Sequence, residues 1–161
     1  MPEEPPRVVF DFNIFLQGTA RRNSPARKAM RLFFAGSVTL FVSEPVLAEI
    51  RDVLNRPRIR QKFPKLTDRL VNALIQKIES QAVLIRNVPE EYRFDRDPKD
   101  EPYLNLAIVT DSVFLVSRDY DLLDLMRTNT PEAQSFRTRY PMLTILDAPS
   151  FLNRVPVQKD S

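Results

Sequence analysis

The chain contains no histidine and no cysteine, and its only glycines are Gly18 and Gly36. Without these residues, Ser-His-Asp and Cys-His catalysis are excluded, as are zinc sites built from imidazole or thiolate. Two isolated glycines also cannot form a P-loop or a GxGxxG nucleotide-binding turn. An enzyme with this composition must use Asp, Glu, Lys or Tyr as acid–base groups. It would hold a metal through oxygen ligands, which favours Mg²⁺ or Mn²⁺.

The sequence also has no feature that points to a membrane or to secretion. No apolar run approaches the roughly 20 residues needed to span a bilayer. The first residues, MPEEPPR, lack the basic and apolar regions of a signal peptide. A chain without cysteine forms no disulfides, which is typical of a reducing compartment. We therefore expect a cytoplasmic protein with no membrane partner.

The composition is that of an ordinary globular domain with a mild basic excess. The chain has 161 residues, of which 43% are hydrophobic and 28% charged, and its net charge is +3. This length suits one domain with a substantial core. Basic residues gather at 21–31 and 56–65. Such groups can be solvated surfaces of helices and loops, or they can contact a polyanion such as nucleic acid.

Short apolar runs alternate with helical patterns along the chain. Strands are predicted at residues 7–10, 38–42, 83–85, 113–117 and 143–146, with helices at about 24–36, 43–56, 67–82, 102–111 and 119–126 and a closing turn or short helix at 148–155, APSFLNRV. The main runs are continuously apolar, which is typical of parallel strands covered on both faces. We expect an α/β fold, a three-layer α/β/α sandwich around a small, mostly parallel sheet. The domain is expected to cover 7–153, with flexible ends at 1–6 and 154–161.

Two of the predicted helices carry clear boundary signals. In NSPARKAMRLFFAG, Ser24 can cap the helix, Pro25 suits its first position and Gly36 can end it. In SEPVLAEIRDVLNRP, Ser43 can cap the helix, and the residue before Pro57 is expected to end it.

Four acidic residues are expected at one edge of the sheet. Asp11 and Asp119 follow the predicted strands 7–10 and 113–117, Glu49 lies in the helix after strand 38–42, and Asp100 precedes the helix at 102–111. In open α/β sheets, binding sites form beyond the carboxyl ends of the strands. Clustered carboxylates repel one another unless a cation lies between them, and a hard divalent cation suits oxygen ligands.

Each acid also has a purely structural interpretation. Asp100 and Asp119 could be helix N-caps, and Glu49 could be a surface residue, although on a helical wheel it borders the apolar face. Asp11 could serve only as a hydrogen-bonding group. However, it follows three apolar strand residues directly, and an unpartnered carboxylate there would be costly.

The sequence resembles PIN-domain ribonucleases, and among them the toxins of bacterial and archaeal toxin–antitoxin pairs. The similar stretches span about residues 7–152 in family order: RVVFDFN, SPARKAMRLF, SEPVLAEIRDVLNRPRI, RDPKDEPYLNLA and LVSRDYDLLDL. The resemblance implies an α/β/α sandwich whose acidic pocket binds Mg²⁺ or Mn²⁺ and cleaves RNA. The family's catalytic, metal-binding acids would be Asp11, Glu49, Asp100 and Asp119.

The resemblance also suggests supporting residues and partners. Asn13 completes the family's Asp-x-Asn pattern, Ser117 stands where the family often has Ser or Thr, and Asp97 and Asp121 would be auxiliary. Among the basic residues, Arg118, Arg21 and Arg22 are candidates for contacts with the RNA backbone. Family toxins are commonly blocked by a small antitoxin protein and commonly form homodimers, so both partners are expected here.

One residue departs from the family pattern. Phe12 stands between Asp11 and Asn13, where the family usually has a small hydroxyl residue. An alternative function is therefore a catalytically degenerate module that binds RNA or protein. A third interpretation, a receiver-type phosphoryl-transfer domain, requires a lysine after a late strand. No lysine follows residues 113–117 or 143–146 until Lys159.

Overall fold

The computed structural model describes residues 4–155, which form an α/β fold around a five-stranded sheet. The strands are β1 (Arg7–Phe10), β2 (Thr39–Ser43), β3 (Val83–Ile85), β4 (Phe114–Val116) and β5 (Thr144–Leu146). Their order is β3-β2-β1-β4-β5, and every neighbouring pair is parallel. The predicted fold class is confirmed, with a sheet that is fully parallel within the described residues. A receiver-type domain has a different strand order, 2-1-3-4-5, which argues against that interpretation.

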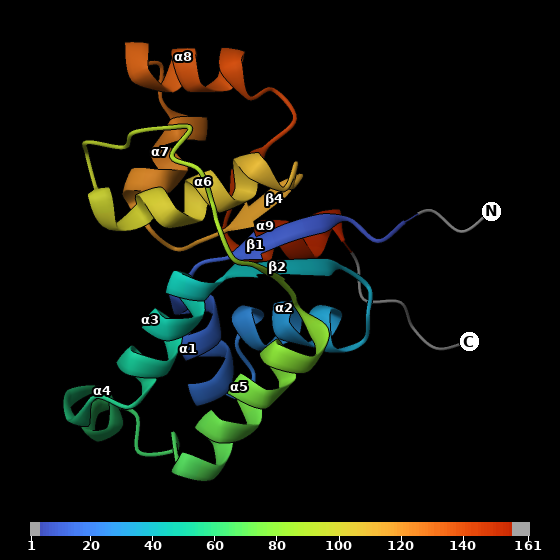
Figure 1. Cartoon of the computed structure of the whole chain (residues 1–161), viewed down its shortest axis with the longest axis vertical. Helices are drawn as coiled ribbons and strands as arrows, with labels where there is room; N and C mark the ends of the chain where they lie inside the picture. The colour runs from blue at the N-terminus through green and yellow to red at the C-terminus, as the bar shows by residue number, and fades with distance from the viewer. Residues whose placement is uncertain (1–3, 156–161) are drawn as a thin grey trace.

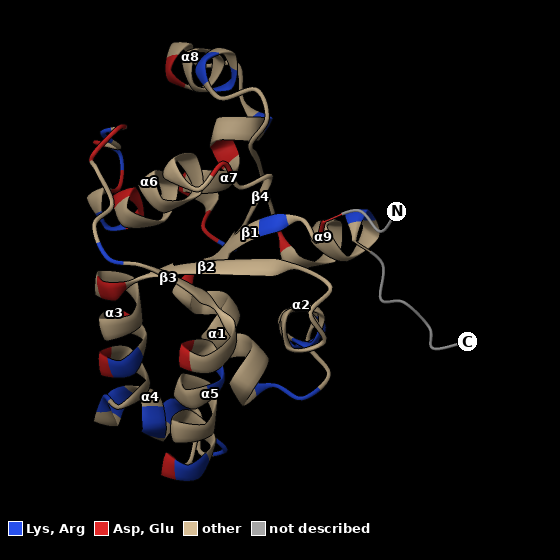
Figure 2. Ribbon diagram, turned by 45° about the vertical axis from the view of Figure 1, so that its right-hand side comes forward, with Lys and Arg blue, Asp and Glu red and all other residues tan. Residues whose placement is uncertain are grey.

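Helices cover both faces of this sheet (Figures 1 and 2). The layer below the sheet in Figure 1 contains α1 (Phe12–Ala20), α2 (Pro25–Phe34), α3 (Glu44–Leu54), α4 (Pro57–Lys62) and α5 (Asp68–Gln81). The layer above it contains α6 (Glu101–Val109), α7 (Tyr120–Arg127) and α8 (Pro131–Arg139). The last helix, α9 (Ala148–Arg154), packs against α2. None of the helices within residues 4–155 is long and apolar enough to cross a membrane.

The predicted caps form as expected. Ser24 Oγ accepts a hydrogen bond from the backbone N–H of Arg27 at 3.1 Å, and Ser43 Oγ accepts one from Val46 at 3.2 Å. Gly36 follows α2 with φ of +77°, in the left-handed region that a side chain would disfavour. These signals are local in sequence, which explains why they could be recognised without tertiary information.

Three helices were not predicted. Helix α1 follows β1 directly, and its residues Ile14, Phe15 and Leu16 are all buried, so it lacks the amphipathic pattern of a surface helix. Helix α4 begins at Pro57, because proline suits a first helical position as well as ending the helix before it. Helix α8, Pro131–Arg139, carries few apolar residues, and only Ala133 and Phe136 are buried.

The strand order places a crevice between β1 and β4. The chain proceeds outwards from β1 through β2 to β3 and then crosses to the other side of β1 to form β4 and β5. The connections that follow β1 and β4 therefore leave on opposite faces, which opens a crevice at the carboxyl ends of these two strands. The backbone N–H of Asp11 still donates to Val116 O at 3.1 Å, so the two segments that follow β1 and β4 separate just beyond this point.

The expected flexible ends, 1–6 and 154–161, lie partly outside the described residues, so the domain boundaries remain a prediction.

Within the described part, the strands that position the crevice are deeply buried. Val8 and Val9 of β1 and Leu115 and Val116 of β4 have no exposed surface. The residues that follow β1 and β4 therefore extend from strands that are covered on both faces.

Candidate metal centre

Asp11 is fixed at the carboxyl end of β1 by hydrogen bonds to its side chain. It is 3% exposed and caps α1, with its Oδ1 accepting from the backbone N–H of Ile14 at 3.3 Å. The hydroxyl of Ser117 donates to Asp11 Oδ2. Burial raises the pKa of the Asp11 carboxyl to about 6, and the hydrogen bonds from Ser117, Ile14 and Asn13 oppose this rise. Asp11 is thus both a helix cap and a carboxylate held in a defined orientation.

Ser117 connects the two strand ends that face the crevice. Its side chain has no exposed surface, and its Oγ accepts a hydrogen bond from the backbone N–H of Asp119 at 3.0 Å while donating to Asp11. Asp119 in turn caps α7, with Oδ1 accepting from the backbone N–H of Asp121 at 2.8 Å. The N-cap interpretation of Asp119 is therefore correct, but its carboxylate also lies close to that of Asp100.

Asp100 is the least satisfied carboxylate in the crevice. It is 7% exposed, and its Oδ2 is buried without a hydrogen-bond partner among the described residues. Asp100 occupies the N-cap position of α6, but its side chain makes no capping hydrogen bond, so capping does not account for its buried carboxylate. Burial raises its pKa to about 9, and the neighbouring carboxyls of Asp119, Asp97 and Asp11 contribute to this rise.

Three of the aspartates converge on one point. Asp97, Asp100 and Asp119 each offer a carboxylate oxygen, and these three oxygens lie within 4.8 Å of one another. Asp97 precedes the 3₁₀ turn Pro98–Asp100 and accepts a hydrogen bond from the backbone N–H of Lys99 at 3.2 Å. Asp11 is not a member of this group. It lies close enough, however, for its charge to contribute to the raised pKa of Asp100. The sequence indicated Asp97 only as an auxiliary residue, whereas the structure places it in the cluster.

These residues suit a hard divalent cation. An all-oxygen donor set without imidazole or thiolate matches the preference of Mg²⁺ and Mn²⁺. A buried carboxylate oxygen without a partner, held near two further carboxylates, is costly unless a proton or a cation compensates it. Asp97, Asp100 and Asp119 are the residues that could hold such a cation, with Asp11 beside them.

Glu49 lies at the border of the crevice on α3. Its side chain is half-buried and lies outside the group of three aspartates. Burial raises the pKa of Glu49, and the neighbouring Tyr103 hydroxyl, Arg56 and Lys99 oppose this rise. The wheel-based prediction that Glu49 borders the apolar face agrees with its partial burial.

Tyr103 is a residue of this region that the sequence did not indicate as functional. Its side chain is 2% exposed, and its hydroxyl is buried without a hydrogen-bond partner among the described residues. Burial raises the pKa of this hydroxyl, as do the negative charges of Glu49 and Asp11. Tyr103 thus lies near both acids and remains a neutral hydroxyl there. Its position in PYLNLA is typical of a helical core residue, so no sequence signal distinguishes it.

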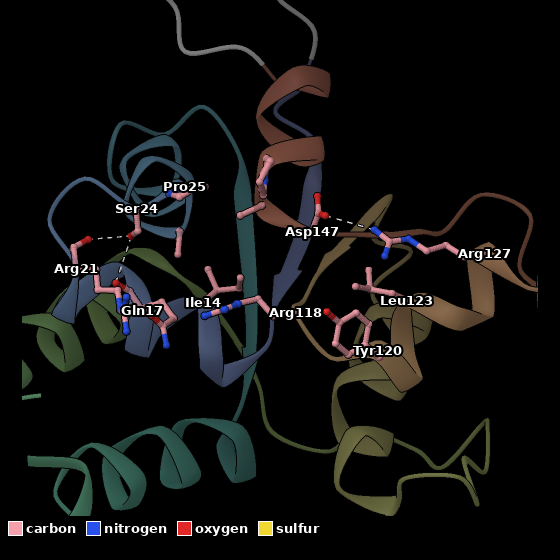
Figure 3. Close-up of a pocket in the computed structure, with 13 residues that line it drawn as sticks. Ile14, Gln17, Arg21, Ser24, Pro25, Arg118, Tyr120, Leu123, Arg127 and Asp147 are labelled. Carbon is pink, nitrogen blue, oxygen red and sulfur yellow. Dashed lines mark hydrogen bonds and ion pairs between the residues drawn. The ribbon is translucent and has the colours of Figure 1, made fainter. Parts of the chain in front are cut away.

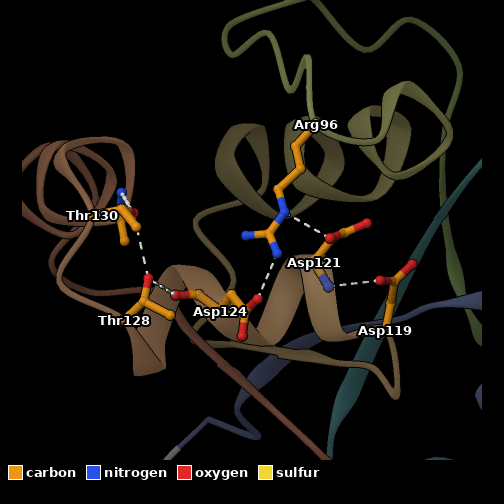
Figure 4. A network of polar contacts seen from close by, with 7 residues as sticks. Arg96, Asp119, Asp121, Asp124, Thr128 and Thr130 are labelled. Carbon is orange, nitrogen blue, oxygen red and sulfur yellow. Dashed lines mark hydrogen bonds and ion pairs between the residues drawn. The ribbon is translucent and has the colours of Figure 1, made fainter.

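Arg96 ties the loop that carries Asp97 to helix α7 (Figure 4). Its guanidinium pairs with Asp121 at 2.7 Å and with Asp124 at 2.6 Å. These carboxylates raise the pKa of Arg96, with the hydrogen bond to Asp124 as the largest cause. Asp121, the second auxiliary acid suggested by sequence, is therefore engaged by Arg96 and does not belong to the three-aspartate group.

The remaining predicted residues differ in their positions. Arg118 and Arg21 line a groove of about 460 Å³ beside the acidic crevice, whereas Arg22 is exposed and does not line it. Asn13 is half-buried in α1 and contributes its backbone N–H to Asp11. Arg27, from the first basic group, donates to the carbonyls of Gly18 and Thr19 and so stabilises the end of α1.

Comparison with known proteins identifies one family. A family model described as "PIN domain" matches residues 7–121, which include β1 to β4, all three clustered aspartates, Asp11 and Glu49. A search of the curated proteins finds no match.

Proposed function

The chain belongs to the PIN-domain family, and we propose that it is an endoribonuclease that hydrolyses RNA phosphodiester bonds with Mg²⁺ or Mn²⁺. Members of this family are generally nucleases. The observation that carries the proposal is the buried, unpartnered oxygen of Asp100, held near the carboxylates of Asp97 and Asp119. This group lies at the crevice between β1 and β4, where open α/β sheets bind their ligands.

The position of each acidic side chain suggests its role in the proposed reaction. Asp97, Asp100 and Asp119 would hold the cation, and Asp11, oriented by Ser117, would complete the acidic site. When bound, Mg²⁺ or Mn²⁺ lowers the pKa of a water molecule and offsets negative charge on phosphoryl oxygens. Glu49, half-buried at the border of the crevice with a raised pKa, would position the attacking water and accept its proton. Attack by this water would form a new P–O bond and break the bond between phosphorus and the 3′ oxygen, which would take up a proton from solvent, so that the products are a 5′-phosphate and a 3′-hydroxyl.

The biological role proposed for this activity is that of a toxin in a toxin–antitoxin pair. It is supported by the five sequence stretches that resemble such toxins. The proposal includes a homodimer, inhibition by a small antitoxin protein and action on cytoplasmic RNA. Light scattering of the purified protein tests the dimer. Growth arrest on expression, relieved by a small protein encoded beside it, tests the toxin role.

Cleavage of a labelled RNA pool tests the nuclease activity. The wild-type protein should cut in Mn²⁺ or Mg²⁺ and should not cut in EDTA, and Asp11→Asn and Asp100→Asn should each lose activity while remaining folded. Asp95→Asn is a matched control, because the Asp95 side chain is 89% exposed and lies outside the cluster. Cleavage that persists in an Asp11→Asn/Asp100→Asn double variant would contradict the assignment.

The alternative function, a degenerate module that binds RNA or protein, rests on Phe12. Phe12 is half-buried at the start of α1, and its ring packs against the hydrophobic core. All four of the predicted acids are still present in the chain beside it. Thermal unfolding with and without Mn²⁺ separates the two functions, because a cation that binds the folded state raises its stability. A folded protein that Mn²⁺ does not stabilise, and that cuts no RNA, would favour the binding module.

A further inference from the structure

We propose that Tyr120 stacks against a base of the RNA substrate, in a groove that holds a single-stranded nucleotide beside the cleavage site. This inference rests on the proposed function and adds to it the residue that contacts the base. Tyr120 directly follows Asp119 and begins α7. Its side chain projects at the groove between α1 and α2 on one side and α7 and α9 on the other (Figure 3).

The exposure of Tyr120 is exceptional in this chain. Its side chain is 75% exposed, whereas every other Phe and Tyr within residues 4–155 is buried or half-buried. A single exposed apolar residue is normal on a protein surface and needs no explanation by itself. Tyr120 differs because it lies next to Asp119 of the acidic centre, in a groove that also contains basic side chains.

The groove combines an apolar floor with positive charge. Ile14, Leu123 and Pro149 contribute apolar surface, and Arg21, Arg118 and Arg127 contribute guanidinium groups. Its volume of about 460 Å³ lies within the range of roughly 300–1,000 Å³ that is typical of small-ligand sites. An aromatic ring beside basic side chains is the arrangement by which proteins bind single-stranded nucleic acid, with stacking on the base and contacts to the phosphate.

The three arginines of the groove differ in whether their charges are already paired. Arg118 is exposed and forms no ion pair with another residue in the described part of the chain. Arg127 pairs with Asp147 at 3.3 Å, so its charge is partly compensated. Arg21 lies 5.8 Å from the centre of the Phe63 ring. Arg118 and Arg21 are therefore the groups best placed to contact phosphates next to a base on Tyr120.

The basic surface continues beyond this groove. A second groove, of about 660 Å³, shares Arg21 and Ser24 with the first and is also lined by Lys62 and Lys65. The two grooves meet at Arg21 and Ser24, just after the end of α1. A polynucleotide with its cleaved bond at the acidic centre can thus place one base on Tyr120 and further phosphates along Arg21, Lys62 and Lys65. A base must leave its helical stack to reach Tyr120, so single-stranded RNA fits this surface better than a duplex.

The absence of tryptophan makes a direct test possible. The variant Tyr120→Trp carries a sole tryptophan, whose fluorescence should be quenched when a base stacks on it. The probe is a single-stranded RNA oligonucleotide of mixed sequence in EDTA, so that no cleavage interferes. Met142→Trp is the matched control, because Met142 is 77% exposed and precedes β5, whereas the acidic centre lies at the carboxyl ends of the strands.

Affinity measurements with labelled RNA complete the test. Tyr120→Ala should raise Kd about five- to tenfold, the lower part of the range for a base stacked on an aromatic ring, and Tyr120→Phe should leave Kd near wild type. An abasic oligonucleotide should bind the wild type and Tyr120→Ala equally. Quenching of the fluorescence of Tyr120→Trp, without quenching of Met142→Trp, supports the inference.

Two results with a protein that binds the RNA would overturn the inference: equal affinity of Tyr120→Ala and wild type, or unquenched fluorescence in Tyr120→Trp. A wild-type protein that does not bind the RNA at all would overturn it as well. The proposed function is judged separately by wild-type cleavage in Mn²⁺. If the wild type cuts RNA but the Tyr120 variants bind it like the wild type, the nuclease assignment holds and the base contact fails. If a base stacks on Tyr120 but the wild type does not cut RNA, the base contact holds and the nuclease assignment fails.

Discussion

The buried hydroxyl of Ser117 donates a hydrogen bond to the carboxylate of Asp11 and thereby joins the carboxyl ends of β4 and β1. The same hydroxyl accepts the backbone N–H of Asp119 at 3.0 Å. One small side chain therefore positions an acid on each side of the crevice. Because the pair lies 106 residues apart in sequence, only the parallel pairing of β1 with β4 brings the two groups together.

Ser117→Ala should impair activity by changing the ionisation of Asp11. The hydrogen bond from Ser117 lowers the pKa of Asp11, so its loss moves that pKa further above about 6. Asp11 then needs a higher pH to be ionised, and the acidic limb of the pH–rate profile should shift to higher pH. At neutral pH we expect a loss of about tenfold, typical of a residue that orients a metal-site ligand. Ser117→Thr, which keeps the hydroxyl, should retain the wild-type profile, and an unshifted limb in Ser117→Ala would contradict this role.

Asp100→Asn should stabilise the metal-free protein and abolish its response to Mn²⁺. Folding raises the pKa of Asp100 from 3.8 to about 9, so the folded state favours the protonated carboxyl. The stability that this group contributes is fully present below pH 3.8 and is lost as the pH rises through about 9. At pH 7 in EDTA, the variant should gain about 1 kcal/mol, or about 2–4 °C in Tm. The gain should be small at pH 4, and a gain that does not vary with pH would contradict this explanation.

Asp97→Asn should weaken cation binding, although the sequence indicated Asp97 only as an auxiliary residue. Its carboxylate is one of the three that lie within 4.8 Å of one another. Loss of this charge should reduce Mn²⁺ affinity at least about tenfold, as measured by the Mn²⁺ dependence of Tm. Asp95→Asn changes a neighbouring exposed carboxylate outside the cluster and should leave the Mn²⁺ dependence unchanged. Equal effects of the two substitutions would indicate a general charge effect.

Arg96→Ala should affect the same cation indirectly. Arg96 holds the segment that precedes Asp97 against Asp121 and Asp124 of α7. Because ion pairs in contact with solvent contribute little to stability, Tm in EDTA should stay close to that of the wild type. The looser loop should nevertheless reduce Mn²⁺ affinity several-fold. Arg93→Ala is the control, because Arg93 is highly exposed and its one ion pair within residues 4–155 is with Asp95, at 3.8 Å.

Asn105→Leu should destabilise the fold and loosen the loop over α6. The Asn105 side chain is buried, accepts from the backbone N–H groups of Glu91 and Tyr92 at 2.8 Å, and donates to the carbonyls of Tyr92 and Glu101 at 3.0 Å. Loss of this set should cost about 2 kcal/mol, or about 4–8 °C in Tm. Hydrogen exchange at Glu91 and Tyr92 should accelerate. Asn72→Leu, on the exposed side of α5, should change neither quantity.

Local sequence patterns determined the strands, most of the helices and the identity of the acids. Continuous apolar runs predict buried parallel strands, and Ser24 and Ser43 mark helix starts because an N-cap needs only its nearest neighbours. The sequence indicates a special role for Asp11, because a lone carboxylate after an apolar strand is costly. Helix α1 escaped prediction because it is largely buried, and its apolar residues continue those of β1.

Tertiary structure alone decided which polar groups share the crevice. It placed Asp97 beside Asp100 and Asp119, paired Asp121 with Arg96, and buried the Tyr103 hydroxyl near Glu49 and Asp11. These relationships depend on the path of the 86–97 loop and on the strand order, which are set by packing between distant segments. Sequence thus specified the chemical groups of the site, because each residue's type and its neighbours along the chain can be read directly from it. Their distances and partners followed only from how the layers pack.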